Sequence, residues 1–208
     1  MITLYSWSTP NGRKVSIMLE ECGLPYEMKA VDIRVGEQFA TQFVAVNPNS
    51  KIPAIVDTDG PDGQPITLFE SGAILVYLAG KSGRFLPDSD RGKYEALQWL
   101  MFQMGGIGPM LGQTHHFMRY ANEKVPYAID RYHKETQRLY EVLNRRLTSA
   151  DFLAGEYSIA DIATYPWVAR HEWHEIDLAD YPAVLRWFDR ISGRPAVQRG
   201  MAVPPPPQ

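Results

Sequence analysis

A hydroxyl, a carboxamide and a guanidinium follow one another near the start of the chain, in the segment Thr9-Pro10-Asn11-Gly12-Arg13-Lys14. An apolar run precedes this segment and a stretch with helical periodicity follows it, which predicts a strand-to-helix turn. Thr9 is suited to cap the helix and Pro10 to begin it, so the free N–H groups of the helix would face the turn. Such a turn can hold an anion. If the anion is a thiolate carried by a ligand, the chain can perform sulfur chemistry without supplying the sulfur.

The chain has a single cysteine, Cys22, and this limits its own redox chemistry. One cysteine excludes an internal disulfide and any CxxC pair, as expected in a reducing compartment, and we therefore predict a cytoplasmic location. Cys22 shares a predicted helix face with Val15, Met18 and Leu19, so a buried structural thiol is favoured over a nucleophile.

The histidines do not match a metal site. His171 and His174 are three residues apart, whereas the zinc-binding helix motif needs a spacing of four, and no third ligand is apparent. A partly exposed helix face is the better interpretation. His115 and His116 are adjacent and would point about 100° apart on a helix, although one of them could line a ligand cavity. We expect no metal.

Composition excludes several other functions. The chain has 208 residues, 45% of them hydrophobic, which is enough for one domain or two small ones with real cores. A net charge of -3 argues against nucleic acid as a partner. No apolar run approaches the ~20 residues needed to span a bilayer, and no secretory leader is apparent, so we expect no membrane partner.

Strands and helices alternate in the first part of the chain, which predicts an α/β domain over residues 1–82. The predicted strands are residues 2–7, 26–33, 52–56 and 66–69, and the predicted helices are residues 11–23, 37–46 and 71–81. The turn-rich residues 59–63 predict that the last two strands form an antiparallel hairpin.

The second part of the chain, residues 90–203, has only helical periodicity and predicts an all-α domain. Ser158 and Asp161 have the spacing of a capping box at the start of a buried helix. Residues 82–90 are the expected linker between the two domains. The proline run 204–207 predicts a frayed or polyproline II end.

Five segments occur in an order typical of one superfamily: Thr9 to Gly12, Asn47 to Ala54, Phe69 to Ile74, Gln98 to Gln113, and His116-Phe117. Nearly the whole chain resembles the glutathione transferase superfamily. Within it, the chain is similar to the bacterial Nu class of glutathione-dependent disulfide-bond oxidoreductases, which are related to yeast Ure2. The resemblance implies a thioredoxin-like N-terminal domain, a helical glutathione-transferase C-terminal domain, a homodimer, and glutathione as co-substrate.

The resemblance also implies which residues bind glutathione. A cis Ile52-Pro53 bond would let the Ile52 backbone pair with the cysteinyl part of the peptide. Ser71, at a helix start, suits the γ-glutamyl carboxylate, and Glu70 suits the α-amino group. An ordinary helix cap is the alternative for this pair.

Two further groups have ordinary surface alternatives. Gln38 and Lys51 suit the glycyl carboxylate, and a solvated surface is their alternative. Arg131 matches an arginine that reaches glutathione across the dimer interface in this class. A surface ion pair with Glu135, four residues further on, is its alternative.

Thr9 and Asn11 are the expected catalytic residues, because they would stabilise the glutathione thiolate. Lowering a thiol pKa from ~8.5 by about two units needs ~2.7 kcal/mol, which a single neutral hydrogen bond barely supplies. The Thr9 hydroxyl, the Asn11 amide and the helix N-terminus together could supply it. Tyr5 and Ser8 lie near the positions of the catalytic tyrosine or serine of other classes and are the alternatives. A Thr9 that only caps and an Asn11 that faces water is the structural alternative.

The reaction expected from the resemblance is thiol–disulfide exchange. The bound thiolate attacks a substrate disulfide, and a second glutathione resolves the mixed disulfide to oxidised glutathione. Conjugation to an electrophile, reduction of organic hydroperoxides, and a non-catalytic glutathione-binding regulator are the alternatives.

Overall fold

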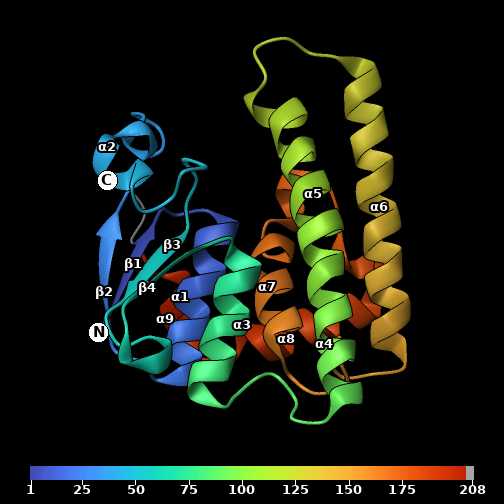
Figure 1. Ribbon diagram of the computed structural model, residues 1–208. Helices are drawn as coiled ribbons and strands as arrows, with labels where there is room; N and C mark the ends of the chain where they lie inside the picture. Colours follow the sequence, from blue (N-terminus) through green and yellow to red (C-terminus); the bar gives the residue numbers. More distant parts are fainter. Residues whose placement is uncertain (205–208) are drawn as a thin grey trace. The chain divides into compact units, whose positions relative to one another are not determined.

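The chain forms two compact units in a computed structural model that describes residues 1–204 (Figure 1). The sheet unit consists of Met1–Arg84 and the C-terminal segment that begins at Arg194, and the helical unit consists of Phe85–Gly193. Most of the predicted polyproline end lies outside the described residues. No described helix is long and apolar enough to cross a bilayer.

The sheet unit contains a four-stranded sheet in the order β2-β1-β3-β4. Its strands and helices before the linker are β1 (Ile2–Ser6), α1 (Pro10–Cys22), β2 (Tyr26–Ala30), α2 (Thr41–Val44), β3 (Ala54–Asp57), β4 (Ile66–Phe69) and α3 (Ser71–Ser82), with short 3₁₀ turns η1 (Glu37–Phe39) and η2 (Pro61–Gly63). Strands β1 and β2 are parallel, whereas β1–β3 and β3–β4 are antiparallel. The thioredoxin-like fold and the hairpin predicted from the sequence are confirmed.

The strand register places the ends of β1 and β4 and the start of β3 side by side, and a site can form where these three chain segments meet. Tyr5 at the end of β1 pairs with Ala54 at the start of β3, which pairs with Phe69 at the end of β4. The chain therefore leaves β1 toward α1, enters β3 after Pro53, and leaves β4 toward α3 at the same edge of the sheet. Helices α1 and α3 lie side by side (Figure 1), so their N-termini meet at this edge.

Three predicted boundaries differ from the structure for local reasons. Strand β2 ends at Ala30 because the chain turns at Asp32, whose carboxylate accepts from the Arg34 N–H at 2.9 Å. The predicted helix 37–46 is divided at Ala40, which is extended with ψ 139°. Strand β3 begins at Ala54 and not at Ile52, since Pro53 has no N–H for a ladder.

The C-terminal helix α9 (Pro195–Met201) belongs to the sheet unit and packs on α1. The Ser16 hydroxyl donates to the Gly200 carbonyl at 2.7 Å, and Arg194 pairs with the buried Glu21 at 2.6 Å. A Cβ at Gly200 would lie 2.4 Å from the Ile17 Cα, so only glycine permits this approach. The sequence analysis had assigned this segment to the helical domain; its tertiary contacts with α1 place it in the sheet unit.

The helical unit contains five α-helices among its described residues: α4 (Asp90–Phe102), α5 (Gly108–His115), α6 (Pro126–Thr148), α7 (Ile159–Val168) and α8 (Pro182–Ser192). Between and after α4 and α5 lie two π-helical turns, η3 (Gln103–Ile107) and η4 (His116–Tyr120), and the 3₁₀ turns η5 (His171–His174) and η6 (Leu178–Asp180) precede α8. The all-α prediction is confirmed. So is the capping box, in which Ser158 and Asp161 bond each other's backbone.

Candidate active site

Thr9 caps helix α1 as predicted. Its Oγ1 accepts from the Gly12 N–H at 3.2 Å, and Pro10 is the first helical residue. A hydroxyl that accepts one hydrogen bond keeps its own proton. Thr9 can therefore cap the helix and donate to an anion at the same time, so the capping alternative and the catalytic role are compatible.

Gly12 brings the first turn of α1 against the end of β1. A Cβ at this position would lie 2.4 Å from both the Ser6 Oγ and the Trp7 carbonyl oxygen. No side chain fits, so the glycine permits the close turn. Asn11, the neighbouring residue, is half-buried on the first turn of α1, where the N–H groups of the helix start are concentrated.

The alternative thiol activators, Tyr5 and Ser8, have partners of their own. Ser6 faces α1, so by strand alternation Tyr5 points to the opposite face of the sheet. Its ring lies 6.0 Å from that of Phe43. The Ser8 hydroxyl accepts from the Arg13 guanidinium at 2.9 Å. These contacts give both residues structural roles near the turn.

The Ile52-Pro53 bond is cis, as the resemblance implies. Asn47, only 2% exposed, holds the loop before it: its amide donates to the Lys51 carbonyl at 2.5 Å and accepts from the Asn49 N–H at 2.9 Å. Ile52 is half-buried against a small apolar core, and the Lys51 side chain is exposed. Asn47 lies in the segment Asn47 to Ala54, but its sequence position alone predicts no role for it.

Glu70 and Ser71 lie at the start of α3. Glu70 is exposed, has a positive φ of 68° and makes no side-chain cap, which removes the ordinary capping role considered for it. Ser71 is buried, and its Oγ accepts from the Lys14 ammonium at 3.2 Å. This contact joins the N-terminal part of α1 to the first turn of α3.

Lys14 is a buried residue beside the candidate site, and its position in the sequence alone predicts no role for it. Burial lowers the pKa of its ammonium to about 7, and the nearby Glu70 carboxylate partly opposes that shift. A signal was present, because Lys14 lies four residues before Met18 and therefore on the predicted apolar face. A lysine on a buried face requires a partner, and only the folded chain shows that Ser71 is one.

Gln38 lies on the 3₁₀ turn η1 and is half-buried. Its side-chain oxygen is buried and has no hydrogen-bond partner in the described part of the chain. This amide therefore has hydrogen-bonding capacity that the protein itself does not use.

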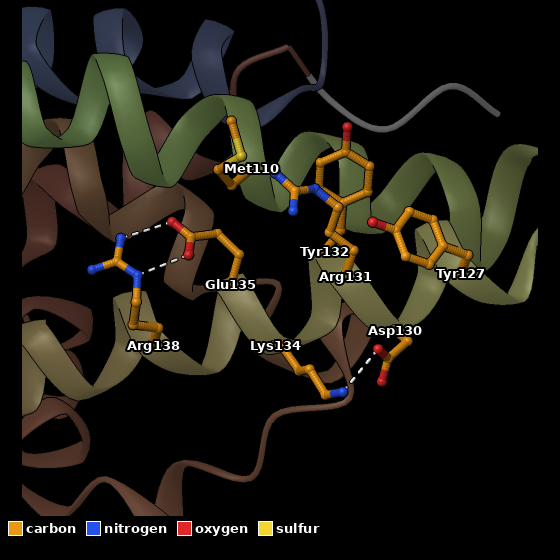
Figure 2. A pocket seen from close by; sticks show the side chains of 8 residues that line it. All are labelled: Met110, Tyr127, Asp130, Arg131, Tyr132, Lys134, Glu135 and Arg138. Carbon is orange, nitrogen blue, oxygen red and sulfur yellow. Dashed lines mark hydrogen bonds and ion pairs between the residues drawn. The ribbon is translucent and has the colours of Figure 1, made fainter.

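Arg131 lines a pocket of about 570 Å³ in the helical unit, formed mainly by α6 (Figure 2). The close ion pair of Glu135 is with Arg138, at 2.7 Å, and not with Arg131 as the surface alternative expected; the Arg131 charge still helps to lower the pKa of Glu135. Lys134, which also lines the pocket, pairs with Asp130 at 2.8 Å. Arg131 is exposed and shares the pocket with two tyrosines and Met110, a setting suited to an anionic ligand.

The lone cysteine lies at the other end of α1. The Cys22 Sγ contacts the Ser82 hydroxyl at 3.2 Å and is half-buried, more exposed than its three predicted face partners. Burial raises the pKa of this thiol. A raised thiol pKa reduces the thiolate fraction, so the local environment opposes nucleophilic reactivity.

Two histidines of the helical unit, His115 and His174, are buried among aromatic rings. His174 is fully buried, which corrects the predicted exposed face of residues 171–174, and its ring stacks on that of His115 at 4.3 Å. Both Nε2 atoms lack hydrogen-bond partners in the described structure. Within residues 1–204, no three potential metal ligands are grouped.

Comparison with known proteins matches both units. Residues 9–81 match the glutathione S-transferase N-terminal domain, and residues 107–195 match the C-terminal domain. The disulfide-bond oxidoreductase YfcG of Escherichia coli is 54% identical over 203 residues, covering 97% of this chain and 94% of YfcG.

Two solved bacterial glutathione transferases have the same fold. One from Burkholderia graminis, with two glutathione molecules bound per subunit, superimposes with a TM-score of 0.94 at 49% identity and covers 99% of this chain and 89% of its own. One from Pseudomonas putida, with one glutathione disulfide per subunit, has a TM-score of 0.94 at 48% identity and covers 98% and 91%. The chain therefore belongs to the glutathione S-transferase family.

Proposed function

We propose that this protein is a glutathione-dependent disulfide-bond oxidoreductase. The thiolate of bound glutathione attacks a substrate disulfide and forms a mixed disulfide, and the thiolate of a second glutathione then attacks that bond. The products are the reduced substrate and oxidised glutathione, so two electrons pass from two glutathiones to one disulfide. The likeness to YfcG over nearly the whole of both chains supports this reaction.

One observation carries the proposal: the polar turn at the sheet edge has no thiol of its own. The only cysteine lies eleven residues after Asn11 on the same helix, which at 1.5 Å per residue is about 16 Å away along the axis. The pKa of Cys22 is raised. A reactive sulfur at the turn must therefore arrive with the ligand.

The residues around the turn suit the parts of glutathione. Thr9 and Asn11, at the positive end of α1, stabilise the thiolate, while the Ile52 backbone pairs with the cysteinyl residue. Glu70 and Ser71 hold the γ-glutamyl end. Gln38 and Lys51 hold the glycyl carboxylate, to which the Gln38 side-chain NH₂ and the Lys51 ammonium would donate.

The related structures support the stoichiometry that the reaction needs. Two glutathiones, or one glutathione disulfide, are bound per subunit in the two relatives. We propose that this site likewise accepts both molecules, and that the enzyme acts in the cytoplasm as a homodimer.

Ligand binding and turnover test the proposal together. Reduced or oxidised glutathione at millimolar concentration should raise the melting temperature, because a ligand that binds only the folded state stabilises it. A small mixed disulfide should be reduced catalytically. Binding with no turnover on disulfides, electrophiles or hydroperoxides would favour the non-catalytic regulator, and turnover confined to electrophiles or hydroperoxides would favour the other transferase activities.

Arg131 tests the contribution of the α6 pocket. Arg131→Ala should weaken glutathione binding by about tenfold, as expected for the loss of a charged hydrogen bond, without lowering the melting temperature. Lys134→Ala is the matched control, because Lys134 lines the same pocket but is paired with Asp130. Equal glutathione affinities of the Arg131 variant and the wild type would show that Arg131 does not contribute to the glutathione site. Light scattering of the variant and the wild type would test whether the protein is a dimer.

A further inference from the structure

Lys14 is buried to a degree that no other cation in the described chain matches. Within residues 1–204 it is the one lysine or arginine that is buried, with 1% of its surface exposed. Lysine is almost never fully buried unless it has a partner. Its ammonium donates to the Ser71 hydroxyl at 3.2 Å, across 57 residues of sequence.

The position of the Lys14–Ser71 contact, at the start of a helix, gives it a role besides packing. Ser71 is the first residue of α3, and its neighbours in the helix start contribute N–H groups that point out of the helix. A hydroxyl that accepts from an ammonium is polarised and becomes a stronger donor. A cation behind the hydroxyl in a low-dielectric interior also attracts an anion in front of it.

We propose that Lys14 is a positioning residue for the γ-glutamyl end of glutathione: it acts through Ser71 to stabilise the α-carboxylate of the ligand, and its protonation is coupled to glutathione binding. The inference rests on the proposed function, since it assumes that glutathione binds at the start of α3. Lys14 would not touch the ligand itself, so a list of the residues in contact with glutathione would not include it.

The charges around Lys14 make it the group that responds to a bound anion. Burial lowers the pKa of Lys14 to about 7, and Glu70 is the charged residue that opposes this shift. On α1 itself, Arg13 donates to Ser8, and Tyr5 on β1 faces the other side of the sheet. The remaining charged groups on the elements packed against α1 have ion partners: Lys81 with Asp57, Arg194 with Glu21, and Arg199 with Glu20.

Coupling has a definite sign. A bound carboxylate favours the charged ammonium and raises the pKa of Lys14. At any pH at which Lys14 of the free protein is deprotonated, ligand binding is therefore accompanied by proton uptake. Affinity should be highest below pH 7 and should fall as the pH rises above 7. No histidine occurs in residues 1–84 or 194–208 to produce the same profile within the sheet unit.

The first experiment combines Lys14→Met with two glutathione analogues in calorimetric titrations. Glutaryl-cysteinylglycine keeps the carboxylate and lacks the amine, whereas 4-aminobutyryl-cysteinylglycine keeps the amine and lacks the carboxylate. The variant should lose about tenfold or more in affinity for glutathione and for the glutaryl analogue, and less than about twofold for the aminobutyryl analogue. Lys93→Met, at an exposed lysine of the helical unit, controls for the change in net charge.

Equal losses for all ligands would show that Lys14 only supports the fold, and would overturn the inference. Lys14→Arg keeps the charge and should restore selectivity for the carboxylate. Melting curves establish that each variant is folded. If wild-type protein bound no glutathione, the proposed function itself would fail and the inference with it, an outcome distinct from wild-type binding with no effect of Lys14.

The second experiment needs no variant. The S-methyl derivative of glutaryl-cysteinylglycine has neither a thiol nor an amine, so no group of this ligand titrates between pH 6 and 8.5 and its affinity for the wild-type protein reports on the proton at Lys14. Its dissociation constant should rise about tenfold between pH 6 and 8.5, and at pH 7.5 the binding heat should vary with the ionisation enthalpy of the buffer, as proton uptake requires. A flat profile, or heats independent of the buffer, would overturn the coupling even if Lys14→Met did not fold.

Discussion

Lys14 in the sheet unit and the His115–His174 pair in the helical unit are buried groups whose pKa values are lowered by the same cause. Burial lowers the pKa of Lys14 to about 7, that of His115 to about 4 and that of His174 to about 2. For Lys14, a carboxylate opposes the shift. For the histidines, nearby arginines add to it.

The neighbours of each group determine whether the lowered pKa affects ligand binding or the stability of the fold. Lys14 contacts a hydroxyl at a helix start, where a ligand can restore its charge. The histidine rings stack on each other, and His115 lies beside Trp167 and Trp173; in the described structure a proton on either Nε2 would have no acceptor. Desolvation thus links the first group to binding and the second to stability.

The largest expected effect lies in the helical unit, at Asp161. Its carboxylate accepts from the Leu153 N–H, the Ser158 N–H and hydroxyl, and the Trp187 indole at 2.8 to 3.2 Å. Asp161→Ala leaves these buried donors unpaired and should lower the free energy of unfolding by about 3 kcal/mol or more. Urea denaturation measures this loss.

Asp151→Ala is the matched control, because Asp151 is 72% exposed and makes a surface ion pair with Arg190. Its cost should stay below about 1 kcal/mol. Similar losses at the two aspartates would contradict the view that the capping network holds the helical unit together.

The next effect is acid sensitivity of the histidine pair. An unfolded chain protonates its histidines near pH 6.5, whereas folded His115 stays neutral down to about pH 4. Acidification from pH 6.5 to 4 therefore favours unfolding, and stability is restored as the pH rises. His115→Phe keeps an aromatic ring but has no titrating group. Between pH 6.5 and 4 its free energy of unfolding should fall by roughly 2–3 kcal/mol less than that of the wild type.

Thermal melts at several pH values follow this difference. His116→Phe serves as the control, since His116 is adjacent but exposed. An unchanged pH slope in His115→Phe, or the same change in both variants, would mean that burial of the pair does not determine acid stability.

A smaller free-energy effect, on rate and not on stability, is expected at the turn of the sheet unit. Asn11→Ala should lower disulfide-reductase turnover by more than about tenfold, which corresponds to ~1.4 kcal/mol of lost thiolate stabilisation. The melting temperature should hardly move. Asn122→Ala, at an exposed asparagine of the helical unit, is the control; an unaffected rate at Asn11 would transfer the role to Thr9, Tyr5 or Ser8.

Cys22 should give the smallest effect. Cys22→Ser replaces a half-buried thiol that contacts Ser82, so the rate per folded molecule should stay within about twofold of the wild type, and any loss of total activity should follow stability. Mass spectrometry of the wild type provides the counter-test. A folded variant that binds glutathione but has no turnover, together with glutathionylated Cys22 in the wild type, would mean that the protein uses its own thiol.

What the sequence predicts well is local. The Thr9 cap and the Ser158–Asp161 box each depend on residues three positions apart, and both are present in the structure. The Lys14–Ser71 contact spans 57 residues and exists only because α1 and α3 lie side by side.

Burial of His174 was mispredicted for a related reason. The spacing of His171 and His174 describes one face of a short turn, whereas the burial comes from rings on α5 and α6, among them His115 and Tyr140. The resemblance to a family supplied the candidate glutathione-binding residues, which spacing alone left open. It gave no role to Lys14, which makes its contact behind that site.

Because α9 packs on α1, the sheet unit can be completed only after the whole chain has been synthesised. Ribosomes make Met1–Arg84 first, then all of Phe85–Gly193, and only then the segment that carries Gly200 to Ile17. The surface of α1 that receives α9 therefore stays uncovered while the entire helical unit is translated. A nascent chain stalled within the helical unit has an unfinished sheet unit, and it would expose that surface of α1 to chaperones and proteases.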